Sequence, residues 1–236
     1  MITANTTPSP TTGAVIVAAG SSRRMGFDKL LTPIGEKPLL AHTLKSATLC
    51  PSINHIVVVI RPDCEAQVLP IISQLHTSIP ITITHGGPER QDSVRLGIAA
   101  LPHHCNYVLI HDAARPFINE SLVQKVLEAA IINGAAVCGH PSRDTLKETD
   151  PDAPEPTIFR TLDRSRIWAV QTPQIFHRPL IEAAYQYVHK RNLHVTDDTA
   201  AMELLGHKVR LVLHNQCNIK ITTPEDWQLA QLLLRQ

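Results

Sequence analysis

The chain has no excess of charge of either sign and no long apolar run. Its 236 residues hold 22 lysines and arginines against 21 aspartates and glutamates, which leaves a formal net charge of +1. Such a balance gives no bulk attraction to nucleic acid or to an anionic membrane, so any polyanion must be bound by a local group of residues. No apolar stretch approaches the roughly 18 residues that a membrane-spanning helix needs. We therefore expect no nucleic-acid partner and no membrane partner.

Close cysteine pairs are absent as well. The five cysteines are scattered and none has the Cys-x-x-Cys spacing, which favours free thiols in a reducing compartment over disulfides or a zinc site. Residues 1–12 are polar and rich in Thr and Pro, and they lack the basic and apolar regions of a secretory signal. We expect these residues to be a disordered tail and the protein to be cytoplasmic.

Common catalytic motifs are also missing. The sequence has no Gly-x-Ser-x-Gly, so a serine hydrolase of that type is not supported. Its first glycine-bearing loop matches neither the Walker pattern nor Gly-x-Gly-x-x-Gly. No His-x-x-x-His pair lies on an expected helix, and no cluster has the spacing of zinc ligands.

What the sequence does have is a regular alternation of apolar runs and amphipathic segments. Runs that are apolar on both faces, separated by helices, are typical of a mostly parallel sheet covered by helices on both sides. The sequence thus predicts an α/β fold that is Rossmann-like, with one domain over residues 13–236. The expected strands are 14–18, 55–60, 81–84, 107–111 and 135–138, and the expected helices are 38–49, 63–75, 91–101 and 120–132.

The alternation stops between residues 141 and 165, where acids and prolines crowd together. This polar segment is either a disordered loop or an arm that reaches a partner. Order is expected to resume with strands at 167–171, 209–213 and 218–221, helices at 179–190 and 197–205, and a last helix from Pro224. Residues 171–174 are expected to form a polar break.

In parallel sheets ligands bind beyond the carboxyl ends of the strands. This rule brings together three loops, residues 19–29, 86–93 and 112–116. The first has small residues and the cations Arg24 and Lys29, so its backbone N–H groups and its charges could both meet a polyphosphate. The alternative for this loop is a surface turn with solvated arginines.

The other two loops offer contacts for a base and a sugar. Asp112 can hold Mg²⁺ or a sugar hydroxyl beside phosphates, or it can simply pair with Arg115 to stabilise its loop. In residues 86–93, glycines allow close contact with a planar ligand and Ser93 can bind a base. The alternative there is an ordinary turn, with residue 91, 92 or 93 as the helix cap.

Two later segments add candidate residues. Lys220 falls inside an expected strand, where a cation is unusual unless it meets an anion. Asp197 and Asp198 open an expected helix, which explains one of the two acids as a cap.

Taken together, these segments resemble the 2-C-methyl-D-erythritol 4-phosphate cytidylyltransferase family. The resemblance runs in order over residues 13–236, and its most specific strings are His-Asp-Ala-Ala-Arg-Pro at 111–116 and Asn-Ile-Lys-x-Thr-x-Pro-Glu-Asp at 218–226. The first loop alone would indicate only a nucleotidyltransferase of this fold. Further matching segments are 18–29, 87–93, 143–147, 163–164, 171–174 and 196–197.

The resemblance implies the fold of the nucleotide-diphospho-sugar transferases, with residues 141–165 as a protruding dimerisation arm. It also implies a reaction of the non-mevalonate isoprenoid pathway. The phosphate of methylerythritol phosphate attacks the α-phosphorus of CTP, forms the cytidine diphospho-alcohol and releases pyrophosphate. Because this nucleophile is already anionic, the protein has to neutralise charge and align the attack rather than supply a general base.

The resemblance also assigns roles to residues. Arg24 and Lys29 stabilise the transition state, and Mg²⁺ is held mainly by the CTP phosphates, with Asp112 as the possible protein ligand. Arg164 and Lys220 complete the catalytic set, and Arg164 serves the partner's site in a homodimer. CTP would contact Ala18, Ala19, Gly20, Gly87, Ser93, Asp112 and Ala113. The acceptor would contact Asp112, Arg115, Thr145, Arg164, Thr196 and Lys220.

Some residues depart from the family's pattern. Ser22 replaces a usual glycine, Pro88 stands where an acid is common, and Leu30 stands where a glutamine is common. Cys217 replaces an aspartate that contacts the hydroxyls of the acceptor. The alternatives are therefore a cytidylyltransferase for another polyol phosphate, such as ribitol 5-phosphate, and a non-catalytic nucleotide-binding protein.

Overall fold

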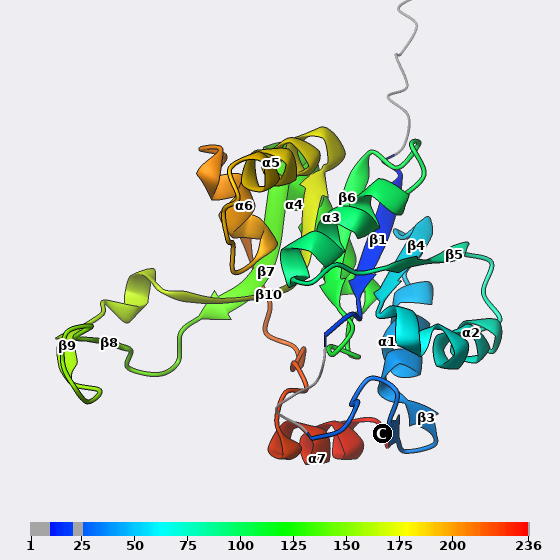
Figure 1. The fold of residues 1–236 in the computed structure, drawn as a ribbon, viewed down its shortest axis with the longest axis horizontal. Coiled ribbons are helices and arrows are strands. Elements are labelled where there is room, and N and C mark those ends of the chain that lie inside the picture. The colour runs from blue at the N-terminus through cyan, green and yellow to red at the C-terminus, as the bar shows by residue number, and fades with distance from the viewer. Residues whose placement is uncertain (1–9, 21–25, 236) are drawn as a thin grey trace, which may run out of the picture.

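A seven-stranded sheet forms the centre of the molecule, in the order β11-β7-β10-β6-β1-β4-β5 (Figure 1). The computed structural model describes residues 10–20 and 26–235. Only β10 runs antiparallel to its neighbours, so the predicted mostly parallel sheet is confirmed. The strands are β1 (Thr12–Val17), β4 (His55–Ile60), β5 (Ile81–His85), β6 (Tyr107–Asp112), β7 (Ala135–Pro141), β10 (Trp168–His177) and β11 (Arg210–Leu213).

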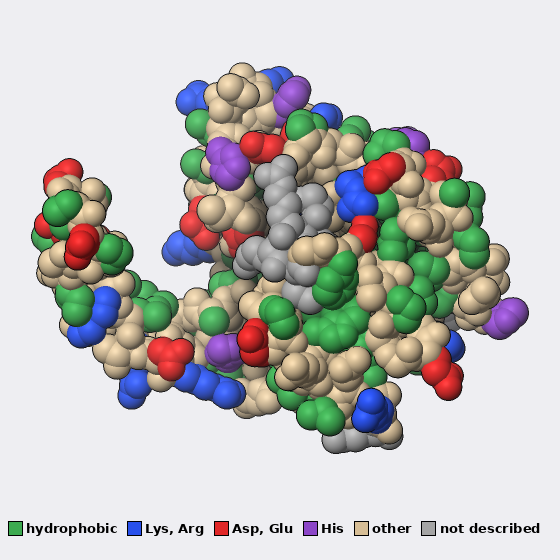
Figure 2. Space-filling view, turned by 60° about the horizontal axis from the view of Figure 1, so that its bottom comes forward, with side chains coloured by type: hydrophobic (Ala, Val, Ile, Leu, Met, Phe, Trp, Pro, Cys, Tyr) green, Lys and Arg blue, Asp and Glu red, His purple; other side chains and the backbone are tan. Residues whose placement is uncertain are grey.

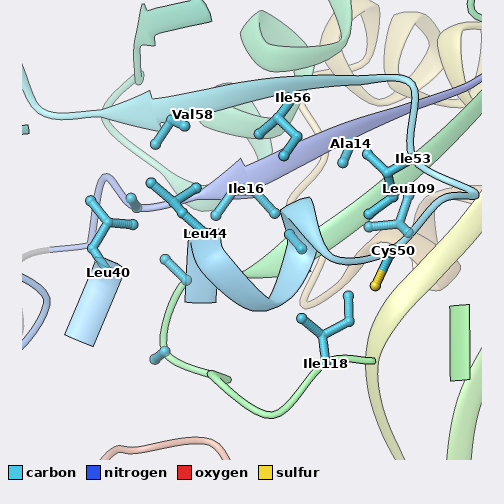
Figure 3. Close-up of a cluster of buried hydrophobic side chains, with 14 of the residues drawn as sticks. Ala14, Ile16, Leu40, Leu44, Cys50, Ile53, Ile56, Val58, Leu109 and Ile118 are labelled. Carbon is cyan, nitrogen blue, oxygen red and sulfur yellow. The ribbon is translucent and has the colours of Figure 1, made fainter. Parts of the chain in front are cut away.

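Helices cover both faces of this sheet, as the sequence predicts. Neighbouring strand residues point to opposite faces, so Ile16 of β1 joins one apolar cluster and Val15 joins the other. Figure 3 shows the first cluster, which includes Leu44 of α1, Ile16 of β1 and Ile56 of β4. The helices are α1 (Leu39–Thr48), α2 (Glu65–Ser73), α3 (Arg90–Ala100), α4 (Glu120–Asn133), α5 (Arg178–Lys190), α6 (Asp198–Leu204) and α7 (Pro224–Leu233).

Burial and capping explain why these elements form where they do. Every residue of β4 is buried, which fits the β-branched run that follows His55, at residues 56–60. The helix α4 begins after Asn119, whose side chain accepts a hydrogen bond from the backbone N–H of Leu122 at 3.0 Å. The same helix ends at Gly134, which has a φ of +79° and suits the left-handed cap.

The amino-terminal boundary differs slightly from the expectation. Thr12 is fully buried and is the first residue of β1, so the strand begins inside the expected 1–12 tail. Residues 1–9, for which we expect disorder, lie outside the described part of the chain.

The predicted strand at residues 218–221 is wrong. The Asn218 side chain donates to the carbonyl oxygen of Thr172 at 2.8 Å. The backbone N–H of Ile221 donates to the carbonyl oxygen of Ala114 at 2.9 Å. Isolated hydrogen bonds, one to β10 and one to the loop after β6, hold this segment in place of a ladder. Lys220 therefore lies in an irregular stretch beside the carboxyl end of β6.

Residues 171–174 do not break the chain's order, because they lie inside β10. Pairing between β10 and β7 changes register between Val170 and Gln174. Within this irregular stretch the Thr172 hydroxyl accepts a hydrogen bond from the backbone N–H of Asp112 at 3.1 Å. The polar sequence thus serves to hold the end of β6.

Residues 141–165 leave the body as a folded arm rather than a disordered loop. The arm carries an antiparallel hairpin of β8 (Lys147–Thr149) and β9 (Ile158–Thr161) that stands apart from the body in Figures 1 and 2. Ile158 and Phe159 are 61% and 63% exposed. Among the residues that the structure describes, no helix has the length and apolar character to cross a membrane.

Candidate active site

A cavity of about 770 Å³ opens at the carboxyl edge of the sheet. All three predicted loops line it, through residues such as Gly20, Ser93 and Asp112, and the later segment adds Lys220. The predicted gathering of these loops at one edge is therefore confirmed. A cavity of this size is within the range that holds cofactors and drug-sized ligands.

Glycines allow the first two loops to approach each other. A Cβ atom on Gly86 would lie 2.6 Å from both the Ala19 Cβ and the Ser93 Oγ, and a Cβ on Gly87 would lie 2.4 Å from that of Asp92. A side chain at Gly86 would push the two loops apart, and one at Gly87 would clash with the first turn of α3. The resulting wall of bare backbone and small side chains suits a planar base.

The second loop ends in a helix cap two residues earlier than the first predicted candidate. Glu89 is the N-cap of α3, and it forms a capping box with Asp92 in which each side chain accepts from the other's backbone N–H. Ser93 donates through its hydroxyl to the Glu89 carbonyl oxygen at 3.1 Å. The prediction of residue 91, 92 or 93 as the cap was wrong, because Asp92 is the third residue of the helix and bonds back to the backbone N–H of the cap Glu89.

Asp112 lies at the centre of the charged groups in the cavity. Its carboxylate is 2.7 Å from the Lys220 ammonium and 3.3 Å from the Arg90 guanidinium. Burial alone would raise the pKa of Asp112, but the positive charges of Arg90 and Lys220 outweigh it and lower that pKa well below its usual range. Asp112 therefore stays ionised, as an acceptor of hydrogen bonds or a cation ligand.

Arg90, which no sequence pattern marks as a site residue, joins Asp112 to a second carboxylate. Two nitrogens of Arg90 donate to Asp198, at 3.0 Å and 2.8 Å, and the Tyr185 hydroxyl donates to the same carboxylate at 2.5 Å. Asp198 has no exposed surface. Its neighbour Asp197 is the cap of α6, so the second acid serves this ion pair. In the sequence, only the two adjacent aspartates at 197–198 indicated this ion pair.

Lys29 and Lys220 lie on one wall of the cavity. The Lys29 ammonium donates to the carbonyl oxygen of Ile221 at 2.7 Å, next to Lys220 in the chain. Beside Lys29, Phe27 packs edge-on against Trp227 of α7 with 5.5 Å between ring centres. Arg24, the other predicted catalytic cation, lies outside the described residues.

Several predicted residues lie behind the cavity wall. Ala18 and Ala113 are buried, and their backbone N–H groups donate to strand carbonyls. Arg115 is also buried, and burial lowers its pKa. Its guanidinium donates to the Asn218 carbonyl oxygen at 2.6 Å and so joins the third loop to the segment that carries Lys220.

Three predicted acceptor contacts do not line the cavity of their own chain. Thr145 and Arg164 are exposed on the arm, where the Arg164 guanidinium donates to the carbonyl oxygen of Arg143 at 3.2 Å. Thr196 is exposed just before α6. Within the described ranges no group of three or more His, Cys, Asp or Glu side chains is placed to hold a metal ion.

The chain is similar over almost its whole length to known cytidylyltransferases. Residues 12–236 match the family model described as 2-C-methyl-D-erythritol 4-phosphate cytidylyltransferase. Proteins of that name from Dehalococcoides mccartyi (strain CBDB1) and Caldanaerobacter subterraneus subsp. tengcongensis are 42% and 40% identical, and each alignment covers 94% of this chain. The aligned regions make up 96% and 98% of those two proteins.

Solved structures agree with the sequence comparisons. A 4-diphosphocytidyl-2C-methyl-D-erythritol synthase from Anaerococcus prevotii superposes with a TM-score of 0.85 at 32% identity, over 96% of this chain and 99% of that one. The cytidylyltransferase of Thermus thermophilus gives a TM-score of 0.76 at 31% identity, over 94% and 98%. The chain therefore belongs to the 2-C-methyl-D-erythritol 4-phosphate cytidylyltransferase family.

Proposed function

We propose that this chain transfers CMP from CTP to 2-C-methyl-D-erythritol 4-phosphate. The products are 4-diphosphocytidyl-2-C-methyl-D-erythritol and pyrophosphate, in the synthesis of isoprenoid precursors. The observation that carries this proposal is a single cavity that joins a glycine-walled base site to Lys29, Asp112 and Lys220. Family membership over residues 12–236 supports the same reaction.

The cavity explains how the reaction proceeds without a general base. Cytosine lies against Gly86, Gly87 and Ser93, and the triphosphate extends toward Lys29. The acceptor's phosphate is already anionic and attacks the α-phosphorus in line, while pyrophosphate leaves. Lys29 and Lys220 oppose the charge that builds up on the phosphates, in a preorganised site where such charges are most effective.

Asp112 has a separate task in this scheme. Because its pKa is lowered, it is ionised at neutral pH and accepts hydrogen bonds from sugar hydroxyls. It also fixes the Lys220 ammonium at 2.7 Å.

We propose Mg²⁺ as the cofactor. Asp112 is an ionised carboxylate on the cavity wall, where it could share with the CTP phosphates in holding this ion. Bound there, Mg²⁺ neutralises phosphate charge.

We further propose a homodimer in which each arm crosses to the other subunit. Arg164 does not line the cavity of its own chain, and the arm exposes Ile158 and Phe159 at its far hairpin. In the dimer, Arg164 of the partner subunit would complete each site. The five unpaired cysteines support a cytoplasmic location.

The test is pyrophosphate release with CTP and Mg²⁺, run separately with methylerythritol phosphate and with ribitol 5-phosphate. We expect turnover with the first acceptor and a kcat/KM at least tenfold lower with the second. Lys220→Ala should lose most of this activity, while Lys190→Ala, an exposed lysine away from the cavity, should keep it. Preference for ribitol 5-phosphate would overturn the acceptor, and CTP binding without any turnover would indicate a nucleotide-binding protein.

A further inference from the structure

Arg61 contacts both ends of the segment that carries Arg24. Its Nη1 donates to the carbonyl oxygen of Gly20 at 3.1 Å, and its Nη2 donates to the carboxylate of Asp28 at 2.6 Å. Gly20 and Asp28 lie on either side of residues 21–25. One side chain from the turn after β4 therefore joins two positions that are eight residues apart in the sequence.

The fold fixes Arg61 at this place. It is the first residue after β4, and it begins the turn at Pro62–Cys64. Its side chain is 27% exposed and lines the cavity near the first loop. Asp63 accepts a further hydrogen bond from the Arg61 Nε at 3.2 Å, which orients the guanidinium plane.

Asp28 transmits this contact to Lys29. Its other carboxylate oxygen accepts from the backbone N–H of Leu30 at 3.2 Å, and its carbonyl oxygen accepts from the Thr32 hydroxyl at 2.8 Å. Holding Asp28 therefore holds the backbone on both sides of Lys29. The planar fork of an arginine can serve two acceptors in a fixed geometry, which a lysine cannot do.

We propose that Arg61 is a positioning residue for the nucleotidyl transfer. It ties Gly20 to Asp28, so that these two positions and Lys29 keep their places around the triphosphate of CTP. The effect reaches the substrate through Asp28 and Lys29, whereas Arg61 has no hydrogen bond to Asp112 or Lys220 among the described residues. This inference rests on the proposed function for its kinetic test.

The experiment compares Arg61→Ala, Arg61→Lys, Asp28→Asn and the double variant Arg61→Ala/Asp28→Asn. Asp63→Asn is the matched control, because Asp63 is 70% exposed and an amide oxygen in its place still accepts the hydrogen bond from the Arg61 Nε. We expect Arg61→Ala to lower kcat/KM for CTP about tenfold, with the KM for methylerythritol phosphate and the melting temperature nearly unchanged. Arg61→Lys should recover little activity, and Asp63→Asn should resemble the wild type.

The double variant decides whether the two residues act through each other. If they do, the kcat/KM of the double variant for CTP should be no lower than that of the less active single variant. Independent roles would instead multiply the two losses. Wild-type kinetics in Arg61→Ala, multiplied losses, or equal losses for both substrates with a lowered melting temperature would each overturn the proposal.

Calorimetric titration with Mg²⁺ and CTP separates this inference from the proposed function. Absence of wild-type turnover with normal CTP binding would refute the transfer reaction. In that case, a Kd for CTP in Arg61→Ala equal to that of the wild type would also refute the role of Arg61. A Kd about tenfold higher than that of the wild type would support it.

Discussion

At the scale of single residues, burial decides which groups carry charge in and around the cavity. Asp112 is buried yet remains ionised, because Arg90 and Lys220 lower its pKa. His111, next to it in the chain, is buried and neutral. Its Nε2 donates to the Arg115 carbonyl oxygen at 2.9 Å, and its Nδ1 lies 3.0 Å from the Thr172 hydroxyl. His111 is thus part of the framework under the site.

The state of His111 makes the stability depend on pH. Burial lowers its pKa from 6.5 to about 4, so between these values the unfolded chain binds a proton that the folded chain does not. Its contribution is complete above pH 6.5 and is lost as the pH falls toward 4. Between pH 7.5 and 5, the unfolding free energy of the wild type should fall by about 2 kcal/mol more than that of His111→Asn.

Urea denaturation at the two pH values measures this difference directly. His55 and His214 also have lowered pKa values, and they contribute equally to both proteins. Equal pH dependence in the wild type and the variant would show that His111 does not titrate as described.

Cys217 bears on the choice of acceptor. It is exposed and stands directly before Asn218, in the segment that carries Lys220. A carboxylate there would accept hydrogen bonds from substrate hydroxyls, which a thiol does weakly. A charge-assisted hydrogen bond contributes about 1.5–3 kcal/mol, so Cys217→Asp should lower the KM for methylerythritol phosphate about tenfold or more.

The same variant should leave the KM for CTP nearly unchanged, and Cys217→Ser is the neutral control. Weaker use of methylerythritol phosphate by Cys217→Asp, together with better use of another polyol phosphate, would require a different acceptor.

At the scale of elements, three helices meet at one buried carboxylate. Asp198 of α6 binds Arg90 of α3 and Tyr185 of α5. These contacts fix the start of α3, whose first turn borders the base site. Burial raises the pKa of Tyr185, and the charge of Asp198 raises it further, so the hydroxyl remains a donor.

Removing this hydroxyl should destabilise the fold. Tyr185→Phe leaves the buried Asp198 with one donor fewer, and we expect a loss of about 1–3 kcal/mol in the free energy of unfolding. Tyr187→Phe on the same helix is the matched control and should cost less than about 0.5 kcal/mol, because the contact of Tyr187 with the Arg191 side chain is made by its ring. Urea denaturation of both variants decides, and equal losses would contradict the account.

The elements also explain what could be predicted from the sequence. Strands such as β4 are buried on both faces and read as apolar runs, and the loops at their carboxyl ends follow from the parallel order. The prediction for 218–221 failed because isolated contacts to Thr172 and Ala114 set that conformation. Arg90 and Arg61 were missed because their partners lie far away in the sequence, where no local pattern marks the pairing.

At the scale of the whole molecule, the arm of residues 141–165 has no evident role within a single chain. It projects from the body (Figure 1). Arg164, which lies on this arm, does not line the cavity of its own chain. A crossed dimer would use the exposed Ile158 and Phe159 as contacts and would bring Arg164 of the partner subunit to each site.

Mixing two inactive variants tests this arrangement. A dimer of one Lys29→Ala subunit and one Arg164→Ala subunit has one site with both residues intact. Subunit exchange should therefore restore activity, up to about half of the wild-type turnover in each mixed dimer. Verified exchange with no recovery would contradict the crossed arm, and activity in Arg164→Ala alone would remove that residue from the site.

In the proposed reaction, CMP is transferred in the cavity lined by Lys29, Asp112 and Lys220. The most direct measurement is product formation from CTP and methylerythritol phosphate by Lys29→Ala, beside wild type and Lys190→Ala. Loss of a preorganised cation typically costs on the order of 10²–10³ in kcat, so Lys29→Ala should lose at least that much with a melting temperature near that of the wild type. A folded Lys29→Ala protein that keeps more than about a tenth of the wild-type turnover would contradict the account.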